Sequence, residues 1–381
     1  MNALFENGPL FLQVAKRLRE EIMGLPVGTK IATDVGLARQ FSVSVSVVRE
    51  ALSILTREGW VTRHVGRGTF TASPHVGKPI AILSDLDFGS VSHPQAILLR
   101  IQEAVRLIEA RGQRVQVYLG NRPWGSEAPE SLCSKTFLED AKTGAFAGVL
   151  AVWAAPLENW TRLLQEKNIP LVGIGLLHEK TVSYDLEAYI RLALETLKKR
   201  GRRRIAYLGG MSSWNLQGHN EQQKKDVPRW FAEAGVKTHP SWFQHNWHPS
   251  QPGASWDSFR EIWSSRKEKP DGIIVNPPRL WNDLALALAS MNLQIPRDLD
   301  VTLSMESAIL PHLPPSAAIP IVFDSPRLVH EAIDLLFSLM EGKTDIETRR
   351  LVNAWSVQEP CAHSIEKNTI DSISPFSTLF H

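Results

Sequence analysis

The sequence is poor in cysteine and has no long apolar run. Its 381 residues include two cysteines, Cys133 and Cys361, so neither a disulfide framework nor a CxxC-type metal site is expected. No apolar stretch approaches the ~20 residues that a membrane-spanning helix needs. Lys16 and Arg17 follow the first apolar residues, which is not the order of a signal peptide. We therefore expect a cytoplasmic protein that makes no membrane contact.

Signatures of catalysis are also missing. The chain has no GxSxG, no Walker loop and no GxGxxG at a strand–helix junction, and no acid pair for glycosidic chemistry stands out among its 40 acids. His239, His245 and His248 lack the HxxxH spacing of a metal site, so we expect a loop there. We predict no enzyme, no catalytic residues, no metal and no cofactor.

What remains is an ordinary globular composition with an uneven charge distribution. Hydrophobic residues make up 43% and charged residues 22%, and the length predicts two or three domains. Residues 1–72 hold nine Lys/Arg against six acids, although the whole chain has a net charge of only +2. A small basic segment on a near-neutral body indicates a module that binds a polyanion.

Within residues 1–72, apolar spacing predicts helices over 9–23, 34–40 and 44–57. Thr33 and Ser44 are suitable N-caps for the second and third helices. The third helix buries a stripe that begins at Val48, and its first turns carry Val45, Ser46 and Arg49 on the opposite face. Two short helices joined by a tight turn predict a helix-turn-helix, whose second helix offers these three residues to base edges in the major groove.

A β-hairpin is predicted after these helices. Residues 60–62 and 69–71 alternate like strands around a segment with two glycines, which allows a tight turn and a close approach to DNA. Arg63 and Arg67 would reach phosphates or the minor groove. The predicted DNA-binding residues are Thr33, Ser44, Val45, Ser46, Arg49, Arg63, His64, Gly66 and Arg67.

The run IATDVGLARQFSVSVSVVREALSILTREGWVTRHVGRGTF resembles the winged helix-turn-helix of GntR-family bacterial repressors over roughly 65 residues. The resemblance implies a DNA-binding head. Three positions depart from the family pattern, which usually has Arg in place of Val35 and Val45 and often Thr in place of Val47. We therefore expect a narrow base readout, with Arg49 on a guanine and Val45 on a thymine methyl.

Beyond residue 79 the chain alternates strands with helices, which predicts an α/β fold with a parallel sheet in two lobes. The predicted domains are residues 1–72 as the DNA-binding head, 73–79 as a linker, 80–360 as the two-lobed body and 361–381 as a tail. The predicted strands are 79–84, 115–119, 148–153, 171–174, 205–209, 272–275, 301–304, 321–323 and 351–355. The predicted helices of the body are 93–112, 134–144, 157–167, 185–200, 221–234, 254–266, 280–291 and 326–341.

The body resembles the effector domain of LacI-family repressors, which is itself similar to periplasmic sugar-binding proteins. The segments that carry the resemblance are AGVLAVW, NIPLVGIG, VSYDLEAYIRLALETLKKRGRRRIAYLGG, PDGIIVN and QIPRDLDVTL. A GntR-type head on such a body resembles arabinose-repressor-like hybrid regulators. The resemblance implies a dimeric repressor that responds to a sugar or a sugar derivative.

In parallel sheets the ligand crevice lies beyond the carboxyl ends of the strands. Trp153 and Trp214 offer flat faces on which sugar rings stack, and acid and amide side chains can receive hydroxyl groups. The predicted ligand-binding residues are Asp87, Phe88, Trp153, Asp185, Trp214, Asn215, Asn276 and Asp324. Asp185 fits an N-cap as well as a ligand contact.

The family's sugar-binding residues are only partly present. The position of its gripping Arg falls at Gly218 or Gln223, its Asn-Asp pair reads Asn276-Pro277, and the acid of its G-F-D turn falls near Met305 or Glu306. The fold resemblance is therefore stronger than the resemblance of the sugar site.

The sequence predicts a bacterial DNA-binding transcriptional regulator, a repressor whose binding to double-stranded operator DNA is modulated by a small-molecule effector. Two heads of a homodimer would bind the half-sites of a near-palindrome. One alternative is a ligand-blind repressor whose body serves only for dimerisation. A second alternative is an enzyme acting on small sugars, against which the missing catalytic motifs argue.

Overall fold

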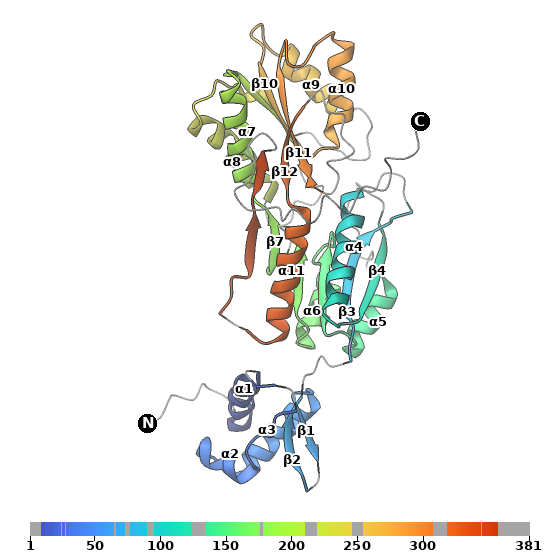
Figure 1. The fold of residues 1–381 in the computed structure, drawn as a ribbon, viewed down its shortest axis with the longest axis vertical. Coiled ribbons are helices and arrows are strands. Elements are labelled where there is room, and N and C mark those ends of the chain that lie inside the picture. The colour runs from blue at the N-terminus through green and yellow to red at the C-terminus, as the bar shows by residue number, and fades with distance from the viewer. Residues whose placement is uncertain are drawn as a thin grey trace, which may run out of the picture. The chain divides into compact units, whose positions relative to one another are not determined.

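The computed structural model (Figure 1) describes residues 9–23, 25–26, 28–64, 66–72, 77–89, 95–122, 134–175, 178–209, 219–245, 254–307, 318–343 and 345–356. The chain divides into two compact units. Unit 1 contains residues 1–123, 128–183 and 328–350, which form the N-terminal head and an α/β lobe that we call lobe 1. Unit 2 contains residues 124–127, 184–327 and 351–381 and forms a second α/β lobe, lobe 2.

The head is a three-helix domain with a two-stranded wing. Its elements are α1 (Leu10–Met23), α2 (Asp34–Gln40), α3 (Val45–Arg57), β1 (Val61–His64) and β2 (Gly68–Thr71). Thr33 and Ser44 act as the predicted N-caps, because their hydroxyls accept bonds from the backbone N–H groups of Gly36 and Val47. The amphipathic helices bury one apolar cluster, which contains Val14, Leu18, Ile22, Leu37, Val48, Ala51, Leu52 and Leu55.

Lobe 1 is a six-stranded sheet with strand order β13-β7-β6-β5-β3-β4, in which the pairings from β4 through β7 are parallel. Its core stacks Phe137 on Phe146 with Trp160 edge-on against Phe137. The strands are β3 (Ile80–Leu86), β4 (Val115–Arg122), β5 (Gly148–Val152), β6 (Leu171–Ile174), β7 (Thr181–Tyr184) and β13 (Arg349–Val352). The helices are α4 (Gln95–Ala110), α5 (Lys135–Thr143), α6 (Glu158–Glu166) and α11 (Ser325–Met340).

Lobe 2 is also six-stranded, with strand order β14-β12-β11-β10-β8-β9. All its pairings are parallel except that of β14 with β12. The strands are β8 (Ile205–Gly209), β9 (Phe243–Gln244), β10 (Gly272–Asn276), β11 (Asp300–Glu306), β12 (Ile319–Phe323) and β14 (Ala354–Ser356). The helices are α7 (Leu186–Lys199), α8 (His219–Glu233), the 3₁₀ turn η2 (Pro240–Trp242), α9 (Ala254–Ser264) and α10 (Leu280–Ser290).

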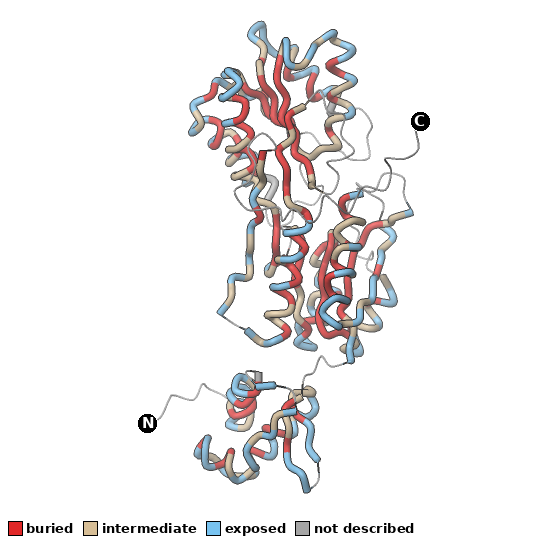
Figure 2. The backbone as a smooth tube through the Cα atoms, viewed as in Figure 1, coloured by how far each residue is buried: buried red, intermediate tan, exposed pale blue. Residues whose placement is uncertain are grey.

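The sheet of lobe 2 separates two apolar clusters. Ala206 and Leu208 belong to one cluster, whereas their neighbours Ile205 and Tyr207 belong to the other. Successive side chains of a strand point to opposite faces, so a strand covered on both sides is apolar throughout. Figure 2 shows the central strands of both lobes buried along most of their length.

The α/β alternation and nearly all the elements predicted from the sequence are confirmed, with ends that differ by a few residues. Two short strands, β7 and β9, were not predicted. β9 has only two residues, and β7 buries the polar side chains of Thr181 and Ser183, so neither shows an apolar run. The single strand predicted over 351–355 is wrong. It is two strands, β13 and β14, which are interrupted at Asn353 and belong to different sheets.

Some predictions fall outside the described residues. Among the predicted domains, these are linker residues 73–76 and the tail 361–381. Among the helices that the structure describes, none combines the length and the apolar character needed to cross a bilayer.

Candidate DNA interface and effector site

The first turns of α3 present the residues predicted to read DNA. Ser46 and Arg49 are exposed, and Arg49 keeps 68% of its side chain accessible. Ser44 caps the helix and shares a 2.8 Å hydrogen bond with Ser46 through their hydroxyls. Val45 is half-buried and packs against the core of the head, so only part of its side chain remains for a base methyl.

Asp34, at the start of α2, holds two of the arginines predicted to bind DNA. Its carboxylate accepts bonds from Arg63 at 2.7 and 2.8 Å and lies 3.4 Å from Nε of Arg49. The partners lie 15 and 29 residues further along the chain, so only the packing of the head shows this pairing. Val35, which stands where the GntR-type pattern has an Arg, is 50% exposed.

The wing is the antiparallel hairpin of β1 and β2, in which His64 pairs with Gly68. Gly66 and Arg67 are exposed at its turn, and both glycines of the turn have positive φ, as the predicted tight turn requires. Gly68 has φ +112, and a Cβ there would lie 2.9 Å from Cε of Lys30.

Lys30 is a candidate DNA contact that was not predicted. It bridges to Phe70, and the N–H of the next residue, Ile31, bonds the carbonyl of Thr69, so residues 28–31 line the wing as a third extended segment. The side chain of Lys30 is exposed and lies against Gly68. No local pattern marks this residue, because the pairing joins segments about 40 residues apart.

In lobe 1, three predicted ligand residues lie at the carboxyl ends of two neighbouring strands. Asp87 and Phe88 follow β3, Trp153 follows β5, and these two strands are neighbours. Trp153 has φ +57, a strained conformation for a large side chain. Asp85 supports these strand ends, because its buried carboxylate accepts a 3.0 Å bond from the N–H of Ala155.

In lobe 2, the predicted ligand residues make internal hydrogen bonds. Asp185 accepts a 2.9 Å bond from the N–H of Ala188, and Asp324 accepts one of the same length from Arg327, so both act as helix caps. Oδ1 of Asn276 accepts a bond from the hydroxyl of Ser304. Trp214 and Asn215 lie outside the described residues.

Gln223, one of the two positions where the resemblance places a sugar-gripping Arg, is buried and turned toward Tyr207. Its amide donates to the Tyr207 hydroxyl at 3.4 Å, and Tyr189 donates to the carbonyl of Val275 at 2.8 Å. Burial raises the pKa of Tyr207 to about 12 and that of Tyr189 well above its usual value. Both tyrosines therefore stay protonated and uncharged well above neutral pH.

A carboxylate that was not among the predicted ligand residues, that of Glu306, ends β11. Glu306 accepts a 2.8 Å bond from Ser325, whose hydroxyl accepts a bond from Tyr184. Tyr184 in turn stacks on Phe323 with ring centroids 4.2 Å apart. This series of hydrogen bonds, from Tyr184 through Ser325 to Glu306, combines an aromatic ring with a half-exposed carboxylate. Groups of these two kinds bind sugars in many pockets.

The described histidines do not form a metal site. His239 caps η2 through Nδ1, and burial together with Lys224 lowers the pKa of His245 to about 4. Residue 248 lies outside the described part. In the part of the chain that the structure describes, no three His, Cys, Asp or Glu side chains gather closely enough to hold a metal ion.

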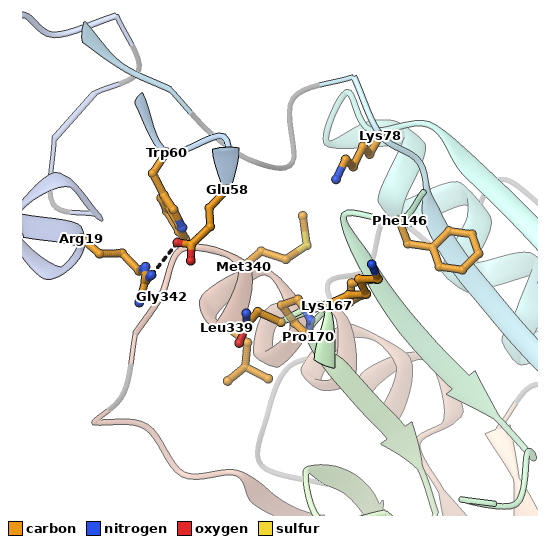
Figure 3. Close-up of a pocket in the computed structure, with 12 residues that line it drawn as sticks. Arg19, Glu58, Trp60, Lys78, Phe146, Lys167, Pro170, Leu339, Met340 and Gly342 are labelled. Carbon is orange, nitrogen blue, oxygen red and sulfur yellow. Dashed lines mark hydrogen bonds and ion pairs between the residues drawn. The ribbon is translucent and has the colours of Figure 1, made fainter. Parts of the chain in front are cut away.

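Unit 1 also contains a cavity of about 270 Å³, shown in Figure 3. Arg19 and Glu58 form an ion pair at this cavity, beside Trp60. Its wall includes none of the predicted DNA-binding or ligand-binding residues, and the cavity is therefore distinct from the predicted effector site.

Comparison with family models matches two parts of the chain. Residues 10–71 match "Bacterial regulatory proteins, gntR family", and residues 194–359 match "Periplasmic binding protein-like domain". The chain is also 24% identical over 316 residues to the "Arabinose metabolism transcriptional repressor" of Halalkalibacterium halodurans. That alignment covers 76% of this chain and 77% of the relative.

Solved structures share the α/β fold. A putative transcriptional regulator LacI from Bacillus cereus subsp. cytotoxis superposes with a TM-score of 0.57 at 15% identity, covering 73% of this chain and 96% of that one. A LacI family transcriptional regulator from Arthrobacter sp. FB24, solved in complex with lactose, gives 0.53 at 17% identity, with coverage of 73% and 96%.

These findings agree with the geometry. The exposed recognition helix and wing lie in the segment matched by the gntR model, and the strand-end residues lie on sheets of the LacI-like fold. The chain thus joins a winged helix-turn-helix that matches the gntR-family model to an α/β body that matches the periplasmic-binding-protein-like model and shares the fold of LacI-type regulators.

Proposed function

We propose that this protein is a cytoplasmic transcriptional repressor whose binding to operator DNA is modulated by a small-molecule effector, a sugar or a sugar derivative. The proposal rests mainly on the exposed residues of the head. Ser46 and Arg49 are exposed on the first turns of a capped recognition helix, and the exposed tip of a wing supplies Gly66 and Arg67. As a homodimer, the protein would place two heads on the half-sites of a near-palindrome.

In this proposal α3 enters the major groove, and Arg49 makes a bidentate contact with a guanine. Arg63, Arg67 and Lys30 bind phosphates around the wing. Operator selection by the full chain tests this assignment. Replacing Arg49 with Ala should relax the preference at one base pair by about 1–3 kcal/mol. Replacing the exposed Arg57, at the other end of α3, should leave the preference unchanged.

An unaltered operator profile for Arg49→Ala would contradict the assignment of Arg49 to a base. A profile altered equally by Arg57→Ala would mean that the two positions act only through the charge of the helix.

The effector part of the proposal rests on the strand ends. In lobe 1, Trp153 and Phe88 are half-buried aromatic residues next to the acid Asp87. In lobe 2, taken by itself, the half-exposed carboxylate of Glu306 is a hydroxyl acceptor. The relative named above takes its name from arabinose metabolism, and one similar structure contains lactose. Both support a carbohydrate effector. Ligand binding would change the equilibrium between arrangements of the protein and alter operator affinity by roughly 5–150-fold, which is typical of allosteric coupling.

Thermal unfolding of the full chain against monosaccharides, oligosaccharides, sugar acids and sugar phosphates tests the effector. A ligand at 100 times its Kd stabilises by ~2.7 kcal/mol, which raises the Tm by about 5 °C for a body of this size. Replacing Trp153 with Phe should reduce that shift. Replacing Trp263, a partly buried tryptophan of α9, with Phe serves as the control.

One observation favours a second candidate function, a ligand-blind repressor whose body only dimerises. Asp185, Asp324 and Asn276 already make internal hydrogen bonds, and Gln223 is buried against Tyr207. DNA affinity that is indifferent to every compound of the panel would support this candidate. A Tm shift together with altered operator affinity would exclude it.

A further inference from the structure

In lobe 2, basic side chains gather at the amino ends of the parallel strands. Strands β8, β9, β10 and β11 are parallel, so the loops that lead into them all lie at the amino ends of the strands. These loops, all described, are residues 198–204, 234–240, 265–271 and 291–300, and we call them the basic loop surface. They carry four carboxylates and eleven basic side chains, namely Lys198, Lys199, Arg200, Arg202, Arg203, Arg204, Lys237, Arg266, Lys267, Lys269 and Arg297.

Backbone hydrogen bonds join these loops into one continuous surface. Lys237 donates its N–H to the carbonyl of Arg203 at 2.8 Å, and Asp271 donates to the carbonyl of Arg204 at 2.8 Å. Asp300 then donates to the carbonyl of Asp271 at 3.0 Å. Charges that are distant in the sequence are therefore held beside one another, although the whole chain has a net charge of only +2.

The four carboxylates of the surface are already paired. Asp300 is 2% exposed and holds two guanidinium groups, those of Arg200 at 3.1 Å and Arg202 at 2.8 Å. Each of the remaining three holds one cation. The pairs are Asp271 with Arg204, Glu268 with Lys237 and Asp298 with Arg297. Because basic groups outnumber these acids, the surface retains a large excess of positive charge.

The excess is exposed. Arg203 is held by the backbone carbonyls of Lys198 and Arg202, at 2.8 and 2.9 Å, which orient its guanidinium without neutralising it. Arg266 and Lys267 are also exposed. Within the described residues, no carboxylate lies within ion-pair distance of Arg203 or Lys267. Arginine forks held in this way suit phosphate oxygens.

We propose that the basic loop surface binds the phosphate backbone of double-stranded DNA, as a second DNA contact outside the head. The surface offers many cations in a continuous patch, which fits a polyanion better than a single small anion. Trp263, an aromatic residue beside it, is partly buried and lies under the ammonium of Lys269, which does not favour stacking with an unpaired base.

The test uses the full chain with its head disabled by Ser46→Glu, Arg49→Glu and Arg67→Glu, so that it is independent of operator recognition. Binding to a random-sequence duplex of about 60 base pairs is measured by fluorescence anisotropy as a function of salt. If the surface neutralises about four phosphates, affinity should fall about 150-fold between 50 and 200 mM salt.

Two paired variants then locate the binding. In the same background, Arg203→Glu with Lys267→Glu should weaken binding at least tenfold. Lys135→Glu with Lys142→Glu reverses two exposed charges on α5 of lobe 1 and should change it less than twofold. Arg203→Gln with Lys267→Gln should give an intermediate loss, which keeps the test informative if the charge reversals unfold lobe 2.

Three results would overturn the proposal. The first is a head-disabled chain that does not bind the duplex at 50 mM salt. The second is equal losses in the lobe 1 and lobe 2 variants, which would reduce the effect to net charge. The third is preferential binding of polyglutamate over duplex DNA, which would assign the surface to an acidic protein.

Discussion

The carboxylate of Asp34 competes with DNA for the arginines of the head, and Asp34→Asn should therefore increase affinity for DNA. In the free protein Asp34 binds Arg63 at 2.7 Å and lies 3.4 Å from Arg49. A phosphate that takes either arginine must displace this carboxylate, and a negative charge then remains close to the DNA. Asparagine keeps the shape of the side chain and removes the charge.

The size of the expected effect follows from how far the three side chains are exposed to solvent. Arg49 and Arg63 keep 68% and 39% of their side chains accessible, and Asp34 keeps 22%, so each pair contributes at most about 1 kcal/mol to folding. Loss of an acid from the first turn of α2 adds a few tenths of a kcal/mol. We expect Asp34→Asn to destabilise the head by about 1 kcal/mol. We also expect it to raise affinity for random-sequence DNA about two- to fivefold, which corresponds to roughly 0.4–1 kcal/mol.

The assay is a salt titration of DNA binding by fluorescence anisotropy, with thermal unfolding run in parallel. Two freed arginines should steepen the slope of log K against log salt by about 1–2 units. Glu21→Gln is the control, because it removes an exposed carboxylate that bonds Gln40 and not an arginine. If Asp34→Asn weakens DNA binding as much as Arg49→Ala does, Asp34 positions the arginines and the competition argument is wrong.

Three further predictions concern stability. Gly68→Ala should cost about 2 kcal/mol, because φ is +112, a conformation that residues with a Cβ rarely adopt. It should also weaken DNA binding, because the new Cβ displaces the end of the Lys30 side chain. Chemical denaturation and anisotropy measure the two effects. Burial lowers the pKa of His178 to about 4. The unfolded chain therefore binds a proton before the folded protein does, and the free energy of unfolding should fall by about 3 kcal/mol between pH 6.5 and pH 4. Unfolding measured against pH should show this slope, and His178→Gln should flatten it. Asp300→Asn should destabilise lobe 2 by about 2–3 kcal/mol, as followed by denaturant unfolding, since it leaves two partly exposed guanidinium groups without their buried acid.

Matched variants separate these effects from general damage. Gly66→Ala also has a positive φ, but its value of +74 lies close to the left-handed region that other residues can adopt, so it should cost less than Gly68→Ala. Asp298→Asn breaks a solvent-screened pair and should destabilise lobe 2 less than Asp300→Asn does. If the two glycine variants lose the same free energy of unfolding, the argument from φ is wrong. If the two aspartate variants lose the same amount, the argument from burial of Asp300 is wrong. A dependence of stability on pH that persists in His178→Gln would contradict the assignment to His178.

The local elements were predictable because their causes are local. Apolar spacing and capping residues mark α2 and α3, and continuous apolar runs mark the central strands. The GxG turn of the wing is likewise visible in the sequence, since only glycine adopts its positive φ at low cost. Two elements without such a local signal were missed, because β9 has only two residues and β7 buries the polar Thr181 and Ser183.

The candidate effector site was predictable only in part. The order of the strands brings Trp153 beside Asp87 and Phe88, as the rule for parallel sheets predicts. The engagement of Asn276 by Ser304 and the inward turn of Gln223 could not be predicted, because both depend on which side chains of separate strands and helices come within hydrogen-bond distance.

The sequence by itself determined the order of domains, the helix-turn-helix and wing, and the α/β alternation, because periodicity, caps and turn residues act over a few neighbouring positions. Tertiary structure alone decided the pairing of Asp34 with Arg49 and Arg63, the place of Lys30 beside the wing, and the division of residues 349–356 between two sheets. It also assembled the basic loop surface from four separate loops. Each of these depends on contacts between segments far apart in the chain, which form only when the whole core has packed.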